Sequence, residues 1–169
     1  MKKIIALLLT GIMVLSLTAC GGTTFTLTQV CDEDETKTAT VTIGYGGSTV
    51  LDEAMLTDDS AELINEEKDF SMEFYLYYYD GYDYYVEDAK TYDGFKEVKY
   101  SGFEGYMYPY DEFEYEVCLK LDEADNCQVM LFAYVAPASD LIDTETTDIE
   151  AIFNQKEVQD ILGSIKYKG

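Results

Sequence analysis

The stretch FEYEVCLKL, residues 113–121, alternates apolar side chains with mostly polar ones. Successive side chains of a β-strand point to opposite faces, so this alternation predicts a strand with one buried face. The predicted buried face consists of Tyr115, Val117, Leu119 and Leu121, and the opposite face consists of Glu114, Glu116, Cys118 and Lys120.

Similar runs lie on both sides of this stretch. Residues 95–100 and 105–110 precede it, and residues 127–135 follow it after the polar turn 121–126. Short runs rich in aromatic and β-branched residues, separated by polar turns, are typical of consecutive antiparallel strands. We therefore expect residues 95–135 to form a β-meander.

The first half of the chain adds further predicted elements. Residues 24–31 and 38–45 alternate threonine with apolar residues, which predicts two half-buried strands. Residues 58–68 begin with good N-cap residues and carry a modest apolar face, which predicts a helix. Residues 70–79 and 82–86 flank Asp-Gly, a pair favoured in tight hairpin turns, so we expect an aromatic-rich β-hairpin there.

The chain ends with a helical pattern. Val158, Ile161, Leu162 and Ile165 recur at spacings of 3, 4 and 7, which places them on one face of an amphipathic helix. The fold class we expect is α+β. It consists of one antiparallel β-sheet meander with amphipathic helices packed on it, including this C-terminal helix.

The N-terminal segment has the features of a secretory signal. Lys2 and Lys3 precede an apolar run at residues 4–17, which is shorter than the about 20 residues that a membrane-spanning helix needs. The run ends in Leu17-Thr18-Ala19-Cys20. This ending resembles the lipobox of bacterial lipoproteins. The resemblance implies cleavage between Ala19 and Cys20 and a diacylglyceryl group on the Cys20 thiol; the alternative is an ordinary signal peptide that ends near a cysteine.

The lipobox resemblance implies a domain division and a location. Residues 1–19 are the expected signal peptide, residues 20–24 a lipidated tether, and residues 25–169 a single globular α+β domain. Two acyl chains are enough for stable anchoring. The expected location is the outer face of the cytoplasmic membrane, or the outer membrane if the envelope has one.

Charge and composition exclude several functions. The chain has 34 acidic residues, 11 basic residues and no histidine, and loss of Lys2 and Lys3 changes its formal charge from −23 to −25. Such a surface repels nucleic acid. Without histidine there is no Ser-His or Cys-His pair. We expect no enzyme activity and no cofactor; a hydrolase that uses paired carboxylates is a less favoured alternative.

A tyrosine-rich segment is the candidate binding surface. Tyr77, Tyr79, Tyr82 and Tyr84 crowd the predicted hairpin. Tyrosine combines an apolar ring with a hydroxyl, which suits a peptide or a glycan. The favoured alternative is structural, since tyrosine is a good strand former and pairs well across strands.

Cysteines and acidic clusters leave two questions open. A bridge between Cys118 and Cys127 is one prediction, while small buried thiols at Cys31, Cys118 and Cys127 are the favoured one. Calcium could bind an acidic cluster. The candidate clusters are 32–35, Asp80 with Asp83, 122–126 and 140–145. A solvated acidic surface is the favoured explanation, so we expect no metal.

Residues 102–108 and 158–166, together with a sheet-rich start, resemble small secreted domains with the PsbP-like fold, which is similar to the Ran-binding Mog protein. The resemblance implies an α+β fold and a non-enzymatic role; no functional residue can be carried over. We expect a lipid-anchored extracytoplasmic binding or accessory domain for an envelope protein, peptide or glycan. The alternative is a calcium-dependent surface module.

Overall fold

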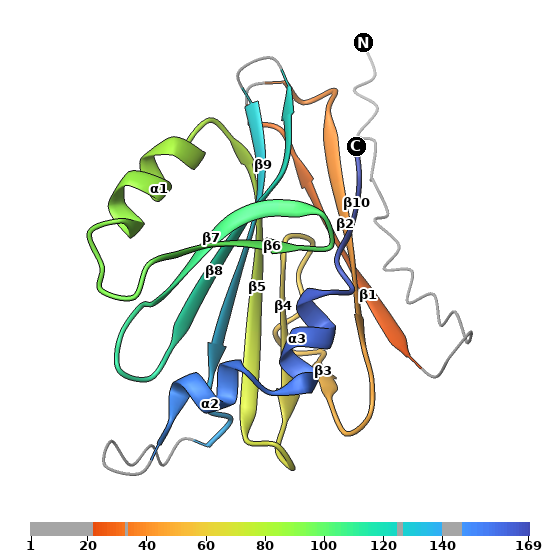
Figure 1. The fold of residues 1–169 in the computed structure, drawn as a ribbon. Coiled ribbons are helices and arrows are strands. Elements are labelled where there is room, and N and C mark those ends of the chain that lie inside the picture. The colour runs from red at the N-terminus through yellow and green to blue at the C-terminus, as the bar shows by residue number, and fades with distance from the viewer. Residues whose placement is uncertain (1–21, 33, 125–126, 140–146) are drawn as a thin grey trace.

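The computed structural model describes residues 22–32, 34–124, 127–139 and 147–169. Their strands form two antiparallel sheets (Figure 1). The smaller sheet has the order β1-β2-β10, with bounds Thr23–Val30, Thr38–Tyr45 and Lys166–Lys168. The larger sheet has the order β3-β4-β5-β9-β8-β7-β6. Its strands in chain order are Val50–Asp52, Ser60–Asn65, Phe70–Tyr79, Lys96–Tyr100, Phe103–Pro109, Tyr115–Ala124 and Cys127–Ala136.

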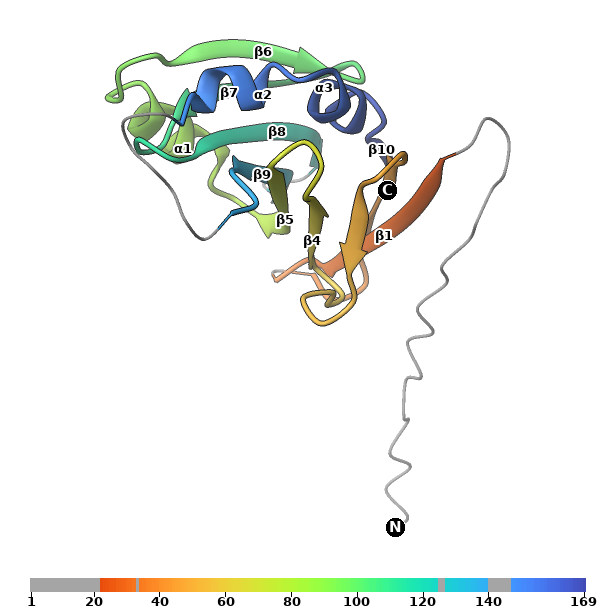
Figure 2. The ribbon, with the colours of Figure 1, turned by 90° about the horizontal axis from the view of Figure 1, so that it is seen from below.

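Within the described residues, three short helices accompany the sheets: α1 (Tyr82–Ala89), α2 (Ile149–Phe153) and α3 (Lys156–Leu162). The larger sheet twists so strongly that β6 and β7 cross the direction of β5 and β9 (Figure 1). Figure 2 shows α2 and α3 on the inner side of this curl, while α1 lies at the opposite side of the sheet. No helix in the described part of the chain is long and apolar enough to cross a membrane.

The main core lies between the two sheets and the two C-terminal helices. Phe25 and Leu27 of β1 and Val41 of β2 pack there with Phe74 of β5 and Leu131 of β9. Val158, Ile161, Leu162 and Ile165 are all at most 3% exposed, so their predicted burial is confirmed, although α3 ends at Leu162 and Ile165 lies beyond the helix. The predicted inward face of β8 is also confirmed, because Tyr115, Val117, Leu119 and Leu121 all belong to this core. The opposite face is not exposed as expected, since Glu116 and Cys118 are buried there.

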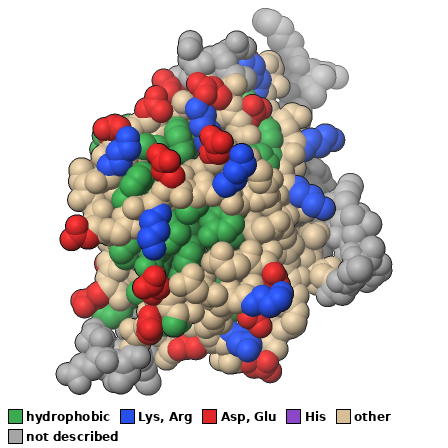
Figure 3. Space-filling model, in the orientation of Figure 1, with side chains coloured by type: hydrophobic (Ala, Val, Ile, Leu, Met, Phe, Trp, Pro, Cys, Tyr) green, Lys and Arg blue, Asp and Glu red, His purple; other side chains and the backbone are tan. Residues whose placement is uncertain are grey.

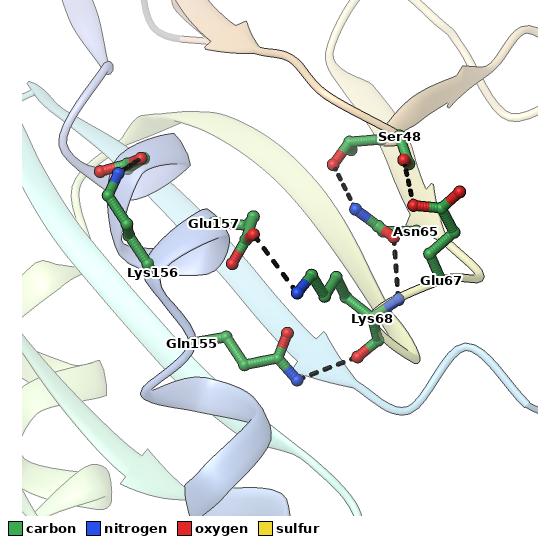
Figure 4. A network of polar contacts seen from close by, with 9 residues as sticks. Ser48, Asn65, Glu67, Lys68, Gln155, Lys156 and Glu157 are labelled. Carbon is green, nitrogen blue, oxygen red and sulfur yellow. Dashed lines mark hydrogen bonds and ion pairs between the residues drawn. The ribbon is translucent and has the colours of Figure 1, made fainter.

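Polar contacts hold α3 against the turn between β4 and β5 (Figure 4). Lys68 in this turn forms an ion pair of 3.8 Å with Glu157, and its backbone carbonyl accepts a hydrogen bond of 2.9 Å from Gln155 Nε2. At the other end of α3, the Ser101 hydroxyl donates to the carbonyl of Gly163 at 2.6 Å. The helix is therefore fixed at both ends to the larger sheet.

The predicted hairpin at residues 70–86 is wrong in its second half. Residues 82–89 form helix α1, not a strand. Tyr82, Tyr85, Val86 and Ala89 follow a spacing of 3, 4 and 7, and all four pack against the outer face of the larger sheet. The Asp-Gly pair therefore ends a strand and precedes a helix. The abundance of aromatic residues suggested a strand, although their spacing is helical.

The predicted helix at residues 58–68 is also wrong, because residues 60–65 form strand β4 between β3 and β5. Ala61, Leu63 and Asn65 alternate into the core. Buried Asn65 donates from Nδ2 to Thr49 Oγ1 at 2.9 Å, and its Oδ1 accepts from the backbone N–H of Lys68 at 3.0 Å. Sheet pairing on both sides thus overrides the local helix signal.

The expectation of one sheet requires a correction as well. The N-terminal hairpin β1–β2 pairs with β10 and not with the meander, which gives two sheets. The protein is mostly antiparallel β with a small helical share, so the α+β description fits loosely. Strand β1 starts at Thr23, within the segment 20–24 that was expected to form the tether.

Candidate functional site

The outer face of the larger sheet carries an aromatic layer under α1. Its buried residues are Ala89, Tyr106, Tyr108, Cys118, Met130 and Phe132. The half-buried residues packed on them are Tyr75, Tyr79, Tyr82, Tyr85, Val86, Phe95 and Tyr134. This layer forms a second, smaller core on the opposite face from the main one.

A pocket of about 550 Å³ opens between α1 and the β6–β7 ladder. Helix α1 contributes Tyr82, Asp83 and Val86, and the segment before β6 contributes Phe95. The strands contribute Glu97, Val98, Lys99, Glu104, Gly105 and Tyr106. Glu97 pairs with Tyr106 and Lys99 pairs with Glu104 in the strand register, so these four side chains share one face of the ladder.

Three aromatic rings meet at Tyr106 in this pocket. The ring centroid of Tyr106 lies 6.0 Å from that of Phe95, with the planes 29° apart, and 6.3 Å from that of Tyr82. Tyr106 is 1% exposed, whereas Tyr82 and Phe95 are half-buried. Burial raises the pKa of Tyr82 to about 12 and also raises that of Tyr106 well above its ordinary value.

Charged side chains stand around the rings. Asp83, Glu97 and Glu104 are exposed carboxylates, and Lys99 Nζ lies 3.4 Å from Glu104 Oε1. On the face drawn in Figure 3, hydrophobic side chains form patches with acidic and basic side chains around them. The pocket therefore has an apolar aromatic wall and a rim that is more acidic than basic.

Gly105 lets the two strands beside the pocket approach closely. A Cβ atom at this position would lie 2.0 Å from the backbone carbonyl oxygen of Cys118 in β8. Any larger residue would push β7 away from β8. The glycine thus holds its neighbours Glu104 and Tyr106 in their places in the pocket.

The buried carboxylate of Glu116 holds the hydroxyl of Tyr106 in place. The Tyr106 hydroxyl donates to Glu116 Oε1 at 3.1 Å, and the hydroxyls of Tyr108 and Tyr134 also donate to Glu116. Burial raises the pKa of Glu116, and these three hydrogen bonds oppose that rise. The network locks the pocket's central ring in one orientation.

Of the four tyrosines predicted to bind, Tyr82 lies in the pocket and the other three lie elsewhere. Tyr77 and Tyr79 stand side by side on β5 with ring centroids 5.8 Å apart, and the Tyr79 hydroxyl is hydrogen-bonded to that of Tyr85. Tyr84 is 72% exposed and contacts the ring of Tyr85. These three form a separate aromatic row along β5 and α1.

The prediction missed most of the pocket. Phe95, Glu97, Glu104 and Tyr106 did not stand out because β6 and β7 looked like ordinary strands of the meander. The helical spacing from Tyr82 to Ala89 is the signal that could have placed α1 on those strands.

The cysteine prediction is settled by the sheet. Cys118 lies in the outer layer and Cys127 in the main core, so the two thiols are on opposite faces and are not bridged. Cys31, Cys118 and Cys127 are buried and form no disulfide, as the favoured prediction had it.

The described residues contain no group of three or more Cys, Asp or Glu side chains placed to hold a metal ion. Residues 140–145, part of the clusters at 32–35 and 122–126, and the predicted lipidation site at Ala19 and Cys20 lie outside the described residues.

No family model, no curated protein and no solved structure matches this chain.

Proposed function

We propose that this chain is a non-enzymatic, extracytoplasmic binding domain, anchored by lipid on Cys20, that takes a small ligand in the pocket between α1 and the β6–β7 ladder. The observation that carries the proposal is the pocket itself. Its volume of about 550 Å³ lies within the usual range of small-molecule sites, about 300–1,000 Å³. It also combines an aromatic wall with a few charged groups, which is the usual composition of such sites.

The pocket is preorganised, which supports a binding role. Tyr106 is held by ring contacts on two sides and by its hydrogen bond to Glu116. A ligand that meets rings already fixed in place loses less free energy to the ordering of side chains. Glu114 and Glu116, whose carboxyl pKa values are raised by burial, do not line this pocket.

The position of the pocket suits a tethered domain. In Figures 1 and 2, α1 and the first residues of β1 lie at opposite sides of the domain. Two residues separate Cys20 from Thr23, where β1 begins. A lipid on Cys20 would therefore hold the side of the domain where β1 begins near the membrane. The pocket beside α1 would then face away from the membrane.

Filling the pocket tests the proposal. Val86→Trp places a large ring inside the pocket, and Val30→Trp makes the same change at an exposed position of β1. Both are made in the unlipidated Cys20→Ser protein and checked for native melting. Ligand-observed NMR then screens a panel of small cationic, neutral and anionic molecules. We expect ligands that bind the parent and Val30→Trp but not Val86→Trp. A panel with no such ligand in any charge class would contradict the proposed function.

A further inference from the structure

We propose that the ligand of this pocket is a small organic cation, with an ammonium group on an apolar body. This inference rests on the proposed function and names the chemistry that the pocket recognises. It combines three observations: the grouping of the rings, the charges at the rim, and a cation that the protein already places on one of these rings.

Aromatic rings form one wall of the pocket. Tyr82 and Phe95 are half-buried rings of the pocket lining, and the almost fully buried ring of Tyr106 packs beside both, with centroids 6.3 Å and 6.0 Å away. The face of an aromatic ring is electrically negative, and a cation within about 6 Å of the centroid is attracted to it. Several rings around one space are the usual way to hold an ammonium group that has shed part of its water.

A lysine of this chain shows that a cation can reach the Tyr82 ring. Nζ of Lys120 lies 5.3 Å from the ring centroid of Tyr82. Lys120 pairs with Glu104 in the register of β7 and β8, so it stands at the border of the pocket. One of the three rings therefore already takes part in a cation–π contact.

The rim charges favour a positive ligand. The pocket is lined by three carboxylates and one ammonium group, and the ammonium group of Lys120 at its border is paired with Glu123. Lys99 is paired with Glu104, whereas Asp83 and Glu97 form no ion pair within the part of the chain that the structure describes. These two carboxylates are available to a ligand cation. An anionic ligand would meet them unfavourably and would also be repelled by the net charge of −23.

The test uses two probes of equal shape. Choline carries a quaternary ammonium group, and 3,3-dimethylbutan-1-ol replaces its nitrogen by carbon and is neutral. Both are titrated by NMR into the unlipidated Cys20→Ser protein. We expect choline to bind about tenfold more tightly, the factor that a partly desolvated cation–π contact and a facing carboxylate together supply. We also expect this preference to shrink as salt is added.

Two matched variants locate the effect. Glu97→Gln removes a carboxylate from the pocket rim and should weaken choline about threefold while leaving the alcohol unchanged. Glu87→Gln removes the same charge from α1 outside the pocket lining and should change neither probe. The inference is overturned if the two probes bind equally, if choline does not bind, or if both variants weaken choline alike. A pocket that binds neutral or anionic members of the panel but not choline would leave the proposed function standing without this inference.

Discussion

The side-chain oxygen of Gln128 in β9 accepts a hydrogen bond of 2.8 Å from the backbone N–H of Tyr82, the first residue of α1. The same oxygen lies 3.3 Å from the backbone nitrogen of Gly81, which also donates to it. The first N–H groups of a helix lack partners within the helix, and here a strand 46 residues away supplies one. Gln128 thus fastens the first turn of α1, the helix wall of the pocket, to the sheet.

Replacing this glutamine should loosen α1. We expect Gln128→Ala to lower the free energy of unfolding by about 1–2 kcal/mol, the upper part of the range for loss of a helix cap, because Gln128 is also buried. The measurement is urea unfolding followed by circular dichroism. The control is Gln29→Ala at a half-buried position of β1. Equal losses in the two variants would contradict the capping role.

The closing helix should contribute strongly to stability. Leu162 is 0% exposed in the main core, and we expect Leu162→Ala to lower the free energy of unfolding by about 2–5 kcal/mol, the range for a buried leucine. Tyr84→Ala, at a side chain that is 72% exposed, should change it by less than about 0.5 kcal/mol. A loss at Leu162 as small as that at Tyr84 would show that α3 does not pack as described.

Stability should fall as the pH rises through the range in which Glu114 titrates. Burial, with the carboxylates of Asp111 and Glu73 nearby, raises the pKa of Glu114 from 4.5 to about 7. Between these values the folded protein keeps a proton that the unfolded chain releases. Rising pH therefore disfavours the folded state, and the loss is complete above about pH 7.

The variant Glu114→Gln cannot titrate at this position. We expect it to match the parent near pH 4 and to be more stable than the parent at pH 8, in thermal melts at fixed ionic strength. Glu112→Gln removes the same charge from an exposed position and serves as the control. If the two variants give the same difference from the parent at every pH, the buried carboxyl is not the cause.

Cys118 should be a reduced thiol in every molecule. Since Cys118 and Cys127 lie on opposite faces of the sheet, alkylation of the unfolded, unreduced protein should label Cys118 completely. Peptide mapping by mass spectrometry measures this. A Cys118–Cys127 peptide joined by a disulfide would show that the strands are arranged differently.

The proposed lipid anchor predicts one further result. Cys20→Ser should leave the protein as an unprocessed precursor or release it from the membrane, because Cys20 is the proposed attachment point. Immunoblots of membrane and soluble fractions give the answer. A membrane-bound variant of mature size would refute the lipoprotein assignment, while Cys31→Ser, at a buried core thiol, should stay in the membrane fraction.

Strands of the meander were predictable because their pattern is local. The alternation from Tyr115 to Leu121 needs no partner to be recognised, and β8 follows it. Helix α1 was not predictable in this way, since its cap comes from Gln128 and the face it covers belongs to β7. Strand β4 depends on pairing with β3 and β5 in the same manner.

The candidate site shows the same limit. Tyr82 was singled out because tyrosines crowd its neighbourhood, but its pocket partners Phe95 and Tyr106 lie in separate elements. Only the packing of α1 on β7 brings them together. The resemblance to the PsbP-like fold stays a prediction.

The aromatic layer gives this domain an optical signature. The chain has 16 tyrosines and no tryptophan, so its near-ultraviolet circular dichroism arises chiefly from tyrosine. The rings of Tyr92, Tyr108 and Tyr106 are stacked in series, with centroids 4.6 Å and 6.0 Å apart, in one fixed chiral arrangement. Such a signal disappears when side-chain packing is lost, even if the backbone structure remains. The spectrum can therefore follow the outer layer in solution without an attached dye.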